Sequence, residues 1–189
     1  SPVTYETDGR TSRIEIDVMG DRAWVTLDAV GEHWAANAAL ALLAATVAGV
    51  APKAAAEALS GYAPPAGRGT AETLQLPNGG EATLVDDAYN ANPESMRAAI
   101  EGLSRRPGRK IVALGEMREL GEGSAALHAG LAGPIVAAGV SAAVLSGAEM
   151  KHLATELSSR DGGIRVLHVE GPMQAADAIK SWVQPGDAV

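Results

Sequence analysis

Hydrophobic and polar residues alternate along the first part of the chain and then change to helical spacing. Within residues 13–28, Ile14, Ile16 and Val18 alternate with polar residues before the Met19-Gly20-Asp21 turn, and Trp24, Val25 and Leu27 follow after it. This pattern predicts two half-buried strands joined by a tight turn. Alanine-rich segments with apolar residues three and four apart come next, and they predict helices over 31–49 and 52–59.

A segment rich in glycine and proline, residues 61–69, separates this part from a different pattern. Beyond it, short apolar runs alternate with stretches of helical spacing. The runs predict strands over 71–76, 82–85, 110–114, 142–145 and 164–169, with another beginning at 187. The stretches between them predict helices over 93–103, 124–138, 148–157 and 173–183. This alternation indicates βαβ units, so the fold class is α/β with a mostly parallel sheet.

Polar and small residues follow the predicted strands of this second part. Ligands of open α/β sheets bind outside the carboxyl ends of the strands. Those ends are Asp86-Asp87, Gly115-Glu116, Ser146-Gly147 and Glu170-Gly171. Since side chains alternate along a strand, only one of two adjacent carboxylates can face a site there.

Composition narrows the possible functions. The 23 acidic residues outnumber the 15 basic ones, and the net charge of −8 argues against non-specific nucleic-acid binding. Cysteine is absent, which excludes disulfides, thiol catalysis and Cys-ligated metals. Four dispersed histidines form no metal motif, and no G-x-x-x-x-G-K-[ST] phosphate loop occurs. No apolar run is long enough for membrane insertion.

Three polar segments could carry chemistry, and each also has a purely structural interpretation. Val85 to Met96 reads V-D-D-A-Y-N-A-N-P-E-S-M, which could simply be a strand-to-helix loop with Asn92 as the N-cap. Leu114 to Gly121 reads L-G-E-M-R-E-L-G, with Ser124 and His128 beyond it, and could be a solvated charged loop. Gly31-Glu32-His33 with Asn37 could be ordinary helix-start chemistry, although His33 and Asn37 share a helix face.

Together these segments resemble the Mur ligase family. The D-D-A-Y-N-A-N-P string is the most specific of the motifs, and P-x-G-R at Pro65 to Arg68 adds to it. The resemblance implies a three-domain chain of about 450 residues. Residues 1–67 would be the C-terminal part of the central ATP-binding domain, with α+β structure. Residues 68–189 would be a C-terminal Rossmann-like domain, truncated at its end.

The loop at 86–96 is most similar to that of the family members that act on D-alanyl-D-alanine. The implied reaction is ATP-dependent addition of D-alanyl-D-alanine to UDP-N-acetylmuramoyl-tripeptide through an acyl phosphate, in peptidoglycan synthesis. It implies ATP and Mg²⁺ as cofactors, with the metal ligands outside this sequence, and a monomer in the bacterial cytoplasm. We expect residues 1–189 alone to be inactive. The alternatives are another Mur-type amino acid ligase and a non-catalytic binding module that retains the fold.

The resemblance also implies roles for individual residues. The expected nucleotide-binding residues are His33, Asn37, Arg68 and Asp87. The loop residues expected to contact substrate or nucleotide are Tyr89, Asn90 and Asn92. No catalytic residue or metal ligand is assigned. Glu116, Glu119 and His128 belong to a segment that matches the family pattern, but no catalytic step is assigned to them.

Overall fold

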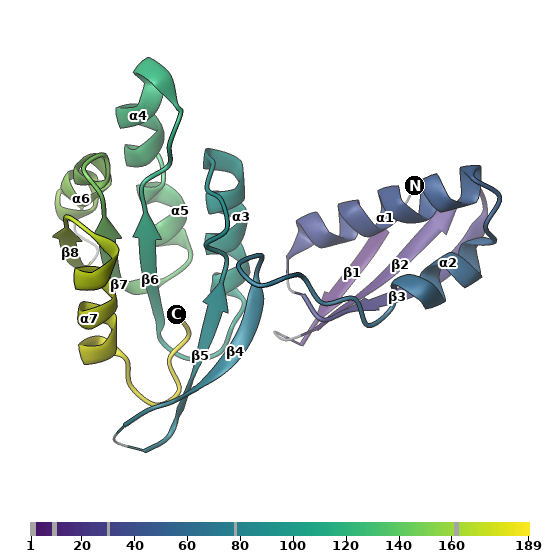
Figure 1. Ribbon diagram of the computed structural model, residues 1–189, viewed down its shortest axis with the longest axis horizontal. Helices are drawn as coiled ribbons and strands as arrows, with labels where there is room; N and C mark the ends of the chain where they lie inside the picture. Colours follow the sequence, from purple (N-terminus) through teal and green to yellow (C-terminus); the bar gives the residue numbers. More distant parts are fainter. Residues whose placement is uncertain (1–2, 9–10, 30, 78, 161–162) are drawn as a thin grey trace. The chain divides into compact units, whose positions relative to one another are not determined.

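The structure is a computed structural model that describes residues 3–8, 11–29, 31–77, 79–160 and 163–189. The chain divides into two compact units. Unit 1 is Ser1–Ala71 and unit 2 is Glu72–Val189. Both units combine helices with a sheet, so the chain has a mixed α/β fold (Figure 1).

Unit 1 is built on an antiparallel sheet with the strand order β1-β2-β3. Its strands are β1 (Val3–Thr7), β2 (Ser12–Val18) and β3 (Asp21–Leu27). Met19 and Gly20 form the two-residue turn between β2 and β3, and both have positive φ, 56° and 95°. Such a turn matches the twist of the strands that it joins. The predicted hairpin is therefore confirmed, whereas β1, which has a single aliphatic residue, was not predicted.

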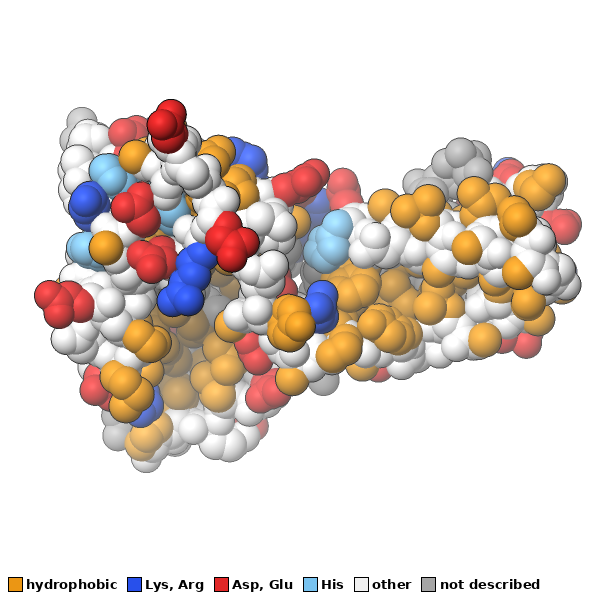
Figure 2. Space-filling model, turned by 45° about the horizontal axis from the view of Figure 1, so that its top comes forward, with side chains coloured by type: hydrophobic (Ala, Val, Ile, Leu, Met, Phe, Trp, Pro, Cys, Tyr) orange, Lys and Arg blue, Asp and Glu red, His pale blue; other side chains and the backbone are white. Residues whose placement is uncertain are grey.

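Two helices cover one face of this sheet (Figure 1). They are α1 (Glu32–Val47) and α2 (Pro52–Leu59), and both confirm the predicted helices. The buried face of the hairpin supplies most of the core, because every second side chain of β2 and β3 points toward the helices. The outward side of α1 is apolar as well, because Leu40, Leu43 and Val47 are exposed. Figure 2 shows that hydrophobic side chains cover much of this unit on the face drawn.

Unit 2 contains a parallel sheet with the order β6-β7-β8 and a two-stranded sheet, β4-β5. The strands are β4 (Thr70–Gln75), β5 (Glu81–Asp86), β6 (Lys110–Gly115), β7 (Val140–Ser146) and β8 (Arg165–Val169). All five were predicted. β7 is buried at nearly every position, as expected for a central parallel strand. The predicted turn between β4 and β5 includes Asn78, which lies outside the described residues.

The last residues of the chain join the two sheets of unit 2. Ala188 forms parallel bridges to Thr83 of β5 and to Lys110 of β6. Val85 N donates to Val189 O at 2.7 Å, and Ile111 N donates to Ala188 O at 2.9 Å. The strand predicted from residue 187 thus lies between β5 and β6.

Helices flank both faces of the parallel sheet. They are α3 (Pro93–Ser104), α4 (Ser124–Ala129), α5 (Ala132–Ala137), α6 (Met150–Ser158) and α7 (Pro172–Trp182). α3, α5 and α6 enclose the main core with one face, whereas α7 packs over Ile111, Ala142 and Val189 on the other. This three-layer arrangement is the Rossmann-like architecture expected for this part of the chain.

The prediction of one continuous helix over 124–138 was wrong. Residues 124–138 form two short helices, α4 and α5, that meet at Gly130 and Leu131. Pro134 has no N–H to donate to the carbonyl four residues earlier, so the helical hydrogen-bond ladder is interrupted here. Leu131 N instead donates to His128 O at 3.1 Å, a tighter turn.

Candidate functional site

The amino end of α1 is held in place by a polar cluster in unit 1. The buried Ser12 hydroxyl donates to Ala29 O at 2.5 Å, and Gly31 N donates to the Tyr5 hydroxyl at 2.8 Å. Gly31 has φ of 141°, and a methyl group built on it would lie 2.6 Å from Cε1 of His33. The His33 ring therefore folds back over a position that only glycine accommodates.

His33 and Asn37 lie on α1 with exposed side chains, one helical turn apart as predicted. The segment that contains Arg68 reaches the same end of the helix. The Trp34 ring lies 6.1 Å from the Tyr62 ring, and a methyl group on Gly69 would lie 3.9 Å from Trp34 Nε1. Within unit 1, the chain neighbours of His33 and Arg68 therefore contact one another.

Arg68 ends a tight turn. Its N–H donates to Pro65 O at 3.2 Å, and Gly67 before it has φ of 77°. A positive φ at the third position of a turn is the conformation that glycine favours. The turn leaves the Arg68 side chain exposed, which suits a guanidinium that binds phosphate.

The loop after β5 carries the acidic and amide residues of the most specific motif. Asp86 Oδ1 accepts from Ala88 N at 3.2 Å, whereas the Asp87 side chain is exposed at the carboxyl end of the strand. Tyr89 and Asn90 are exposed as well, and Asn90 Oδ1 accepts from Ala91 N at 2.9 Å. Of the two adjacent acids, Asp87 is thus the more accessible to a ligand.

Asn92 is the N-cap of α3. Its Oδ1 accepts from Glu94 N at 3.0 Å and from Ser95 N at 2.9 Å, and Asn92 N donates to Ser95 Oγ at 3.1 Å. This reciprocal pair is a capping box, and Pro93 occupies the first helical position. The structural interpretation of Asn92 is therefore confirmed, and its role toward a ligand remains a prediction.

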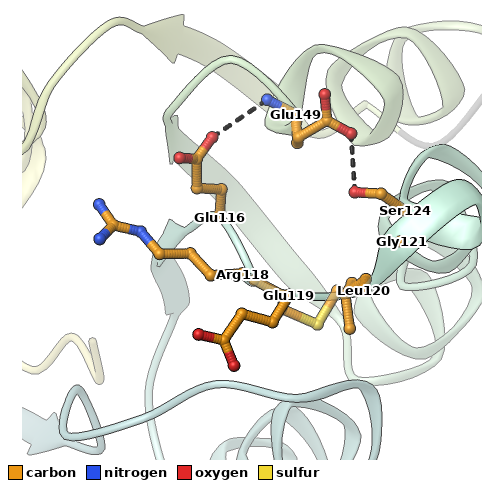
Figure 3. Close-up of a pocket in the computed structure, with 8 residues that line it drawn as sticks. Glu116, Arg118, Glu119, Leu120, Gly121, Ser124 and Glu149 are labelled. Atoms are coloured by element: carbon orange, nitrogen blue, oxygen red, sulfur yellow. Dashed lines mark hydrogen bonds between the residues drawn. The ribbon is translucent and has the colours of Figure 1, made fainter.

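A shallow pocket of about 480 Å³ lies at the carboxyl ends of β6 and β7 (Figure 3). Its polar lining comes from the loop after β6, from Ser124 at the start of α4, and from Glu149 just before α6. The side chains of Arg118 and Glu119 extend from the loop away from Ser124. One guanidinium, that of Arg118, and three carboxylates, those of Glu116, Glu119 and Glu149, thus line the opening.

A chain of hydrogen bonds ties this loop to its neighbours. Met117 N donates to Nε2 of the buried His128 at 2.9 Å, and His128 Nδ1 lies 2.8 Å from Ser124 O. Ser124 Oγ donates to Glu149 Oε2 at 2.7 Å. Glu149 N in turn donates to Glu116 Oε2 at 3.2 Å (Figure 3).

Position 147, in the turn after β7, must be glycine for the Glu116 side chain to lie where it does. Gly147 has φ of 109°, and a methyl group built there would lie 2.6 Å from Oε2 and 2.9 Å from Cγ of Glu116. The Glu116 side chain thus packs directly against the glycine backbone. The backbone of the turn itself is held by Gly147 N, which donates to Val169 O at 3.1 Å.

The hydrogen bond from Ser124 lowers the pKa of Glu149 below its ordinary value. Partial burial opposes this shift, and the nearby charges of His152 and Lys151 add to it. A lowered pKa in the folded state means that this carboxylate stabilises the fold above its unfolded-state pKa. That contribution is lost as the pH falls through the folded-state pKa.

Replacement of Ser124 with alanine is expected to raise the pKa of Glu149, because it removes the largest cause of the shift. The pH titration of the Glu149 carboxyl ¹³C resonance by NMR measures this directly. Ser159→Ala removes a serine whose hydroxyl bonds only a backbone carbonyl, so it serves as the control. Equal Glu149 titration curves for Ser124→Ala and the wild type would contradict the assigned cause.

The structure brings together residues that the sequence left in separate segments. Glu116, Ser124 and His128 were recognised as one motif without a role. Glu116 and Ser124 line the pocket together with Glu149, and the buried His128 bonds the backbone of the loop that lines it. Glu149 was not singled out. The available signal was Ser146-Gly147 at a predicted strand end, since a loop after a parallel strand supplies ligand-binding groups.

Among residues 3–8, 11–29, 31–77, 79–160 and 163–189, no group of three or more His, Asp or Glu side chains is placed to hold a metal ion. Within the same ranges, no helix is long and apolar enough to cross a membrane.

Comparison with known proteins places these features in context. The chain is 36% identical over 134 residues to a UDP-N-acetylmuramoyl-tripeptide–D-alanyl-D-alanine ligase of Mycobacterium bovis, which covers 67% of this chain and 25% of that protein. It is 30% identical over 208 residues to the ligase of the same name from Mycobacterium leprae, which covers 100% of this chain and 40% of that protein. The chain thus spans between a quarter and two fifths of these relatives.

Solved structures show the same fold. The crystal structure of MurF from Acinetobacter baumannii matches with a TM-score of 0.80 and 25% identity, over 98% of this chain and 40% of that one. MurF from Thermotoga maritima, solved in complex with ADP, matches with a TM-score of 0.78 and 22% identity, over 99% of this chain and 41% of that one. The family described as "Mur ligase, glutamate ligase domain" matches residues 67–189. The chain therefore belongs to the Mur ligase family.

Proposed function

We propose that this chain is part of an ATP-dependent amide ligase that adds D-alanyl-D-alanine to UDP-N-acetylmuramoyl-tripeptide in peptidoglycan synthesis. The observation that carries the proposal is the similarity of the whole chain to the Mycobacterium leprae ligase named for this reaction. The D-D-A-Y-N-A-N-P loop at 86–93 supports it. The same proposal makes the enzyme a monomer of the bacterial cytoplasm.

The two parts of the chain have different proposed roles. Residues 1–67 are assigned to the C-terminal part of the central ATP-binding domain, and residues 68–189 to the C-terminal domain. The family match from residue 67 and the division of contacts between Ala71 and Glu72 support a boundary in this region. The phosphate loop and the Mg²⁺ ligands lie outside this sequence in the proposal, so residues 1–189 alone do not catalyse the reaction.

The proposed reaction has two steps. A carboxylate oxygen of the tripeptide attacks the γ-phosphorus of ATP, which forms an acyl phosphate and releases ADP. The amine of D-alanyl-D-alanine then attacks the acyl carbon, phosphate leaves, and the nitrogen loses a proton. Bound Mg²⁺ would neutralise phosphate charge in the first step. Because water would destroy the acyl phosphate, the site must exclude it.

The residues present fit a nucleotide. Arg68 is exposed on a fixed turn, and its planar guanidinium can bind two phosphate oxygens at once. Asp87 is exposed at a strand end and can accept hydrogen bonds from ribose hydroxyls. His33 and Asn37 offer ring and amide groups from one side of α1 to the base. Tyr89, Asn90 and Asn92 are proposed to contact substrate or nucleotide.

Arg68→Ala and Asp87→Ala, made in the longer ligase, are each expected to raise the KM for ATP about tenfold. Each variant removes one charge-assisted hydrogen-bonding group from the nucleotide, and a tenfold change corresponds to about 1.4 kcal/mol. Steady-state kinetics with varied ATP measure the effect. Arg22→Ala and Asp177→Ala remove exposed charges outside the proposed site and should leave the KM unchanged. Unchanged KM values for both Arg68→Ala and Asp87→Ala would refute these roles.

The function itself is tested by phosphate release from the longer protein. Turnover is expected with UDP-N-acetylmuramoyl-tripeptide, ATP and D-alanyl-D-alanine together, and residues 1–189 alone should give none. Turnover with a single amino acid in place of the dipeptide would indicate another Mur-type ligase. No turnover with any amine would indicate a binding module that retains the fold.

A further inference from the structure

The buried His128 side chain is in a single tautomer defined by its partners. A backbone N–H can only donate, so Nε2, which lies 2.9 Å from Met117 N, carries no proton. Nδ1 must then carry the proton in the neutral ring, and it donates to Ser124 O at 2.8 Å. Both ring nitrogens are thereby satisfied inside the protein, as buried polar groups require.

The His128 ring holds the loop after β6 through its hydrogen bond with the Met117 amide. Glu116 N, one residue earlier, donates to Ser146 O at 3.1 Å and so continues the pairing of β6 with β7. At Met117 the chain leaves the sheet, and its N–H bonds the His128 ring instead of another strand. His128 thus fixes the direction in which the loop leaves the sheet.

The same helix turn secures the opposite wall of the pocket. Ser124, whose carbonyl accepts from His128, donates its hydroxyl to Glu149 at 2.7 Å. Glu149 N donates to Glu116 at 3.2 Å. One histidine thereby connects the loop after β6, the start of α4 and the turn before α6, which together line the pocket.

The loop that His128 fixes has features of a functional segment. Glu119 has φ of 62°, a left-handed conformation that is uncommon for residues other than glycine and that costs free energy. Arg118 and Glu119 are both exposed and line the pocket at the carboxyl ends of the strands. A leucine at position 128 would fill the buried space without needing hydrogen-bond partners, so packing alone does not require histidine.

We propose that His128 is a positioning residue of the ligase, which in its neutral Nδ1–H tautomer holds residues 116–121 in the conformation needed for the reaction. The inference rests on the proposed function for its catalytic consequence. The proposal has two parts. The structural part, which comprises the tautomer and the hydrogen bond from Met117, does not depend on any activity. His128 does not itself contact the reacting atoms.

The structural part is tested on residues 1–189 by ¹⁵N NMR and hydrogen exchange. The His128 ring is expected to show an unprotonated Nε2 and a protonated Nδ1. Exchange of the Met117 amide should accelerate about tenfold in His128→Leu, which removes its acceptor. The protonated-Nε2 tautomer, or a Met117 amide equally protected in His128→Leu, would overturn the proposal.

Conservative variants separate positioning from packing. In His128→Gln the side-chain oxygen can still accept from Met117 N, whereas in His128→Asn the shorter side chain can still donate to Ser124 O. Met117 protection should therefore be retained best in His128→Gln and least in His128→Leu. A role in packing alone gives the opposite order, because leucine is the better core residue. His152→Leu, on α6, is the matched control for loss of a histidine.

The catalytic part is tested in the longer ligase. In His128→Leu, kcat should fall about tenfold or more, because a small displacement of a site segment is enough for such a loss. The KM for ATP should change less than about twofold, since the proposed nucleotide residues lie outside this loop. His128→Gln should restore most of kcat. Unchanged kcat in His128→Leu would overturn the positioning role, whereas a wild-type ligase without turnover would refute only the proposed function.

Discussion

Replacing Gly108 with alanine is expected to lower the free energy of unfolding of unit 2 by about 3 kcal/mol. A methyl group built on Gly108 would overlap Gly186 O, and it would lie 3.1 Å from the carbonyl carbon of the same residue. Backbone atoms cannot turn aside as a flexible side chain can, so one of the two segments must move. That movement would weaken the pairing of Ala188 with Lys110.

Urea unfolding of the whole chain, followed through the amide of Ile111, measures this effect. Ile111 N donates to Ala188 O at 2.9 Å and therefore reports the contact directly. Gly139→Ala is the matched control, because Gly139 has φ of 67° but no atom within 4 Å of an added methyl group. It should cost only about 1 kcal/mol, the price of the left-handed backbone. Equal losses for Gly108→Ala and Gly139→Ala would show that the overlap is relieved without consequence.

Asp187→Ala is expected to lower the free energy of unfolding of unit 2 by about 2 kcal/mol. Asp187 is only 4% exposed, and its carboxylate accepts from Arg109 Nε at 3.0 Å, from Arg109 Nη2 at 2.6 Å and from Gln184 N at 2.7 Å. Hydrogen bonds to a buried carboxylate are stronger than neutral ones. Arg109 is 37% exposed, however, and water can solvate it after the change, which keeps the loss below that of a fully buried pair.

Asp177→Ala provides the matched control in the same unit. Asp177 lies 3.7 Å from Lys180 with both side chains largely exposed, so its removal should change stability by less than about 0.5 kcal/mol. The same urea titration measures both variants. The carboxylate also raises the pKa of Arg109, chiefly through the hydrogen bond. A loss of stability no larger for Asp187→Ala than for Asp177→Ala would show that the bidentate pair contributes nothing.

Much of the fold could be predicted because the local signals agree with the tertiary structure. The helix over 52–59 begins with proline and was placed at both of its ends. The parallel strands were found because β6 and β7 are continuous apolar runs, typical of strands buried on both faces. The break between α4 and α5 was missed because alanine and leucine keep the apolar spacing across it, although Gly130, Gly133 and Pro134 are all unfavourable inside a helix.

The candidate site could be predicted only in part. Motifs carried by one continuous segment, such as the loop at 86–96, were visible in the sequence. The connection from Met117 through His128 and Ser124 to Glu149 depends on the packing of α4 against α6, which no local pattern reveals. Glu149 also lies outside the resemblance to the family motifs. Its position became evident only from the carboxyl end of β7.

The position of residues 187–189 between β5 and β6 has a consequence for the order of folding. β5 and β6 are consecutive strands in the sequence, yet neither can complete its pairing until the last residues of unit 2 arrive. Contacts between such distant parts of a chain form slowly, since a long loop must close first. During synthesis, the inner edges of β5 and β6 therefore stay open until residue 189 has been made. In that interval these edges can pair with the wrong strand.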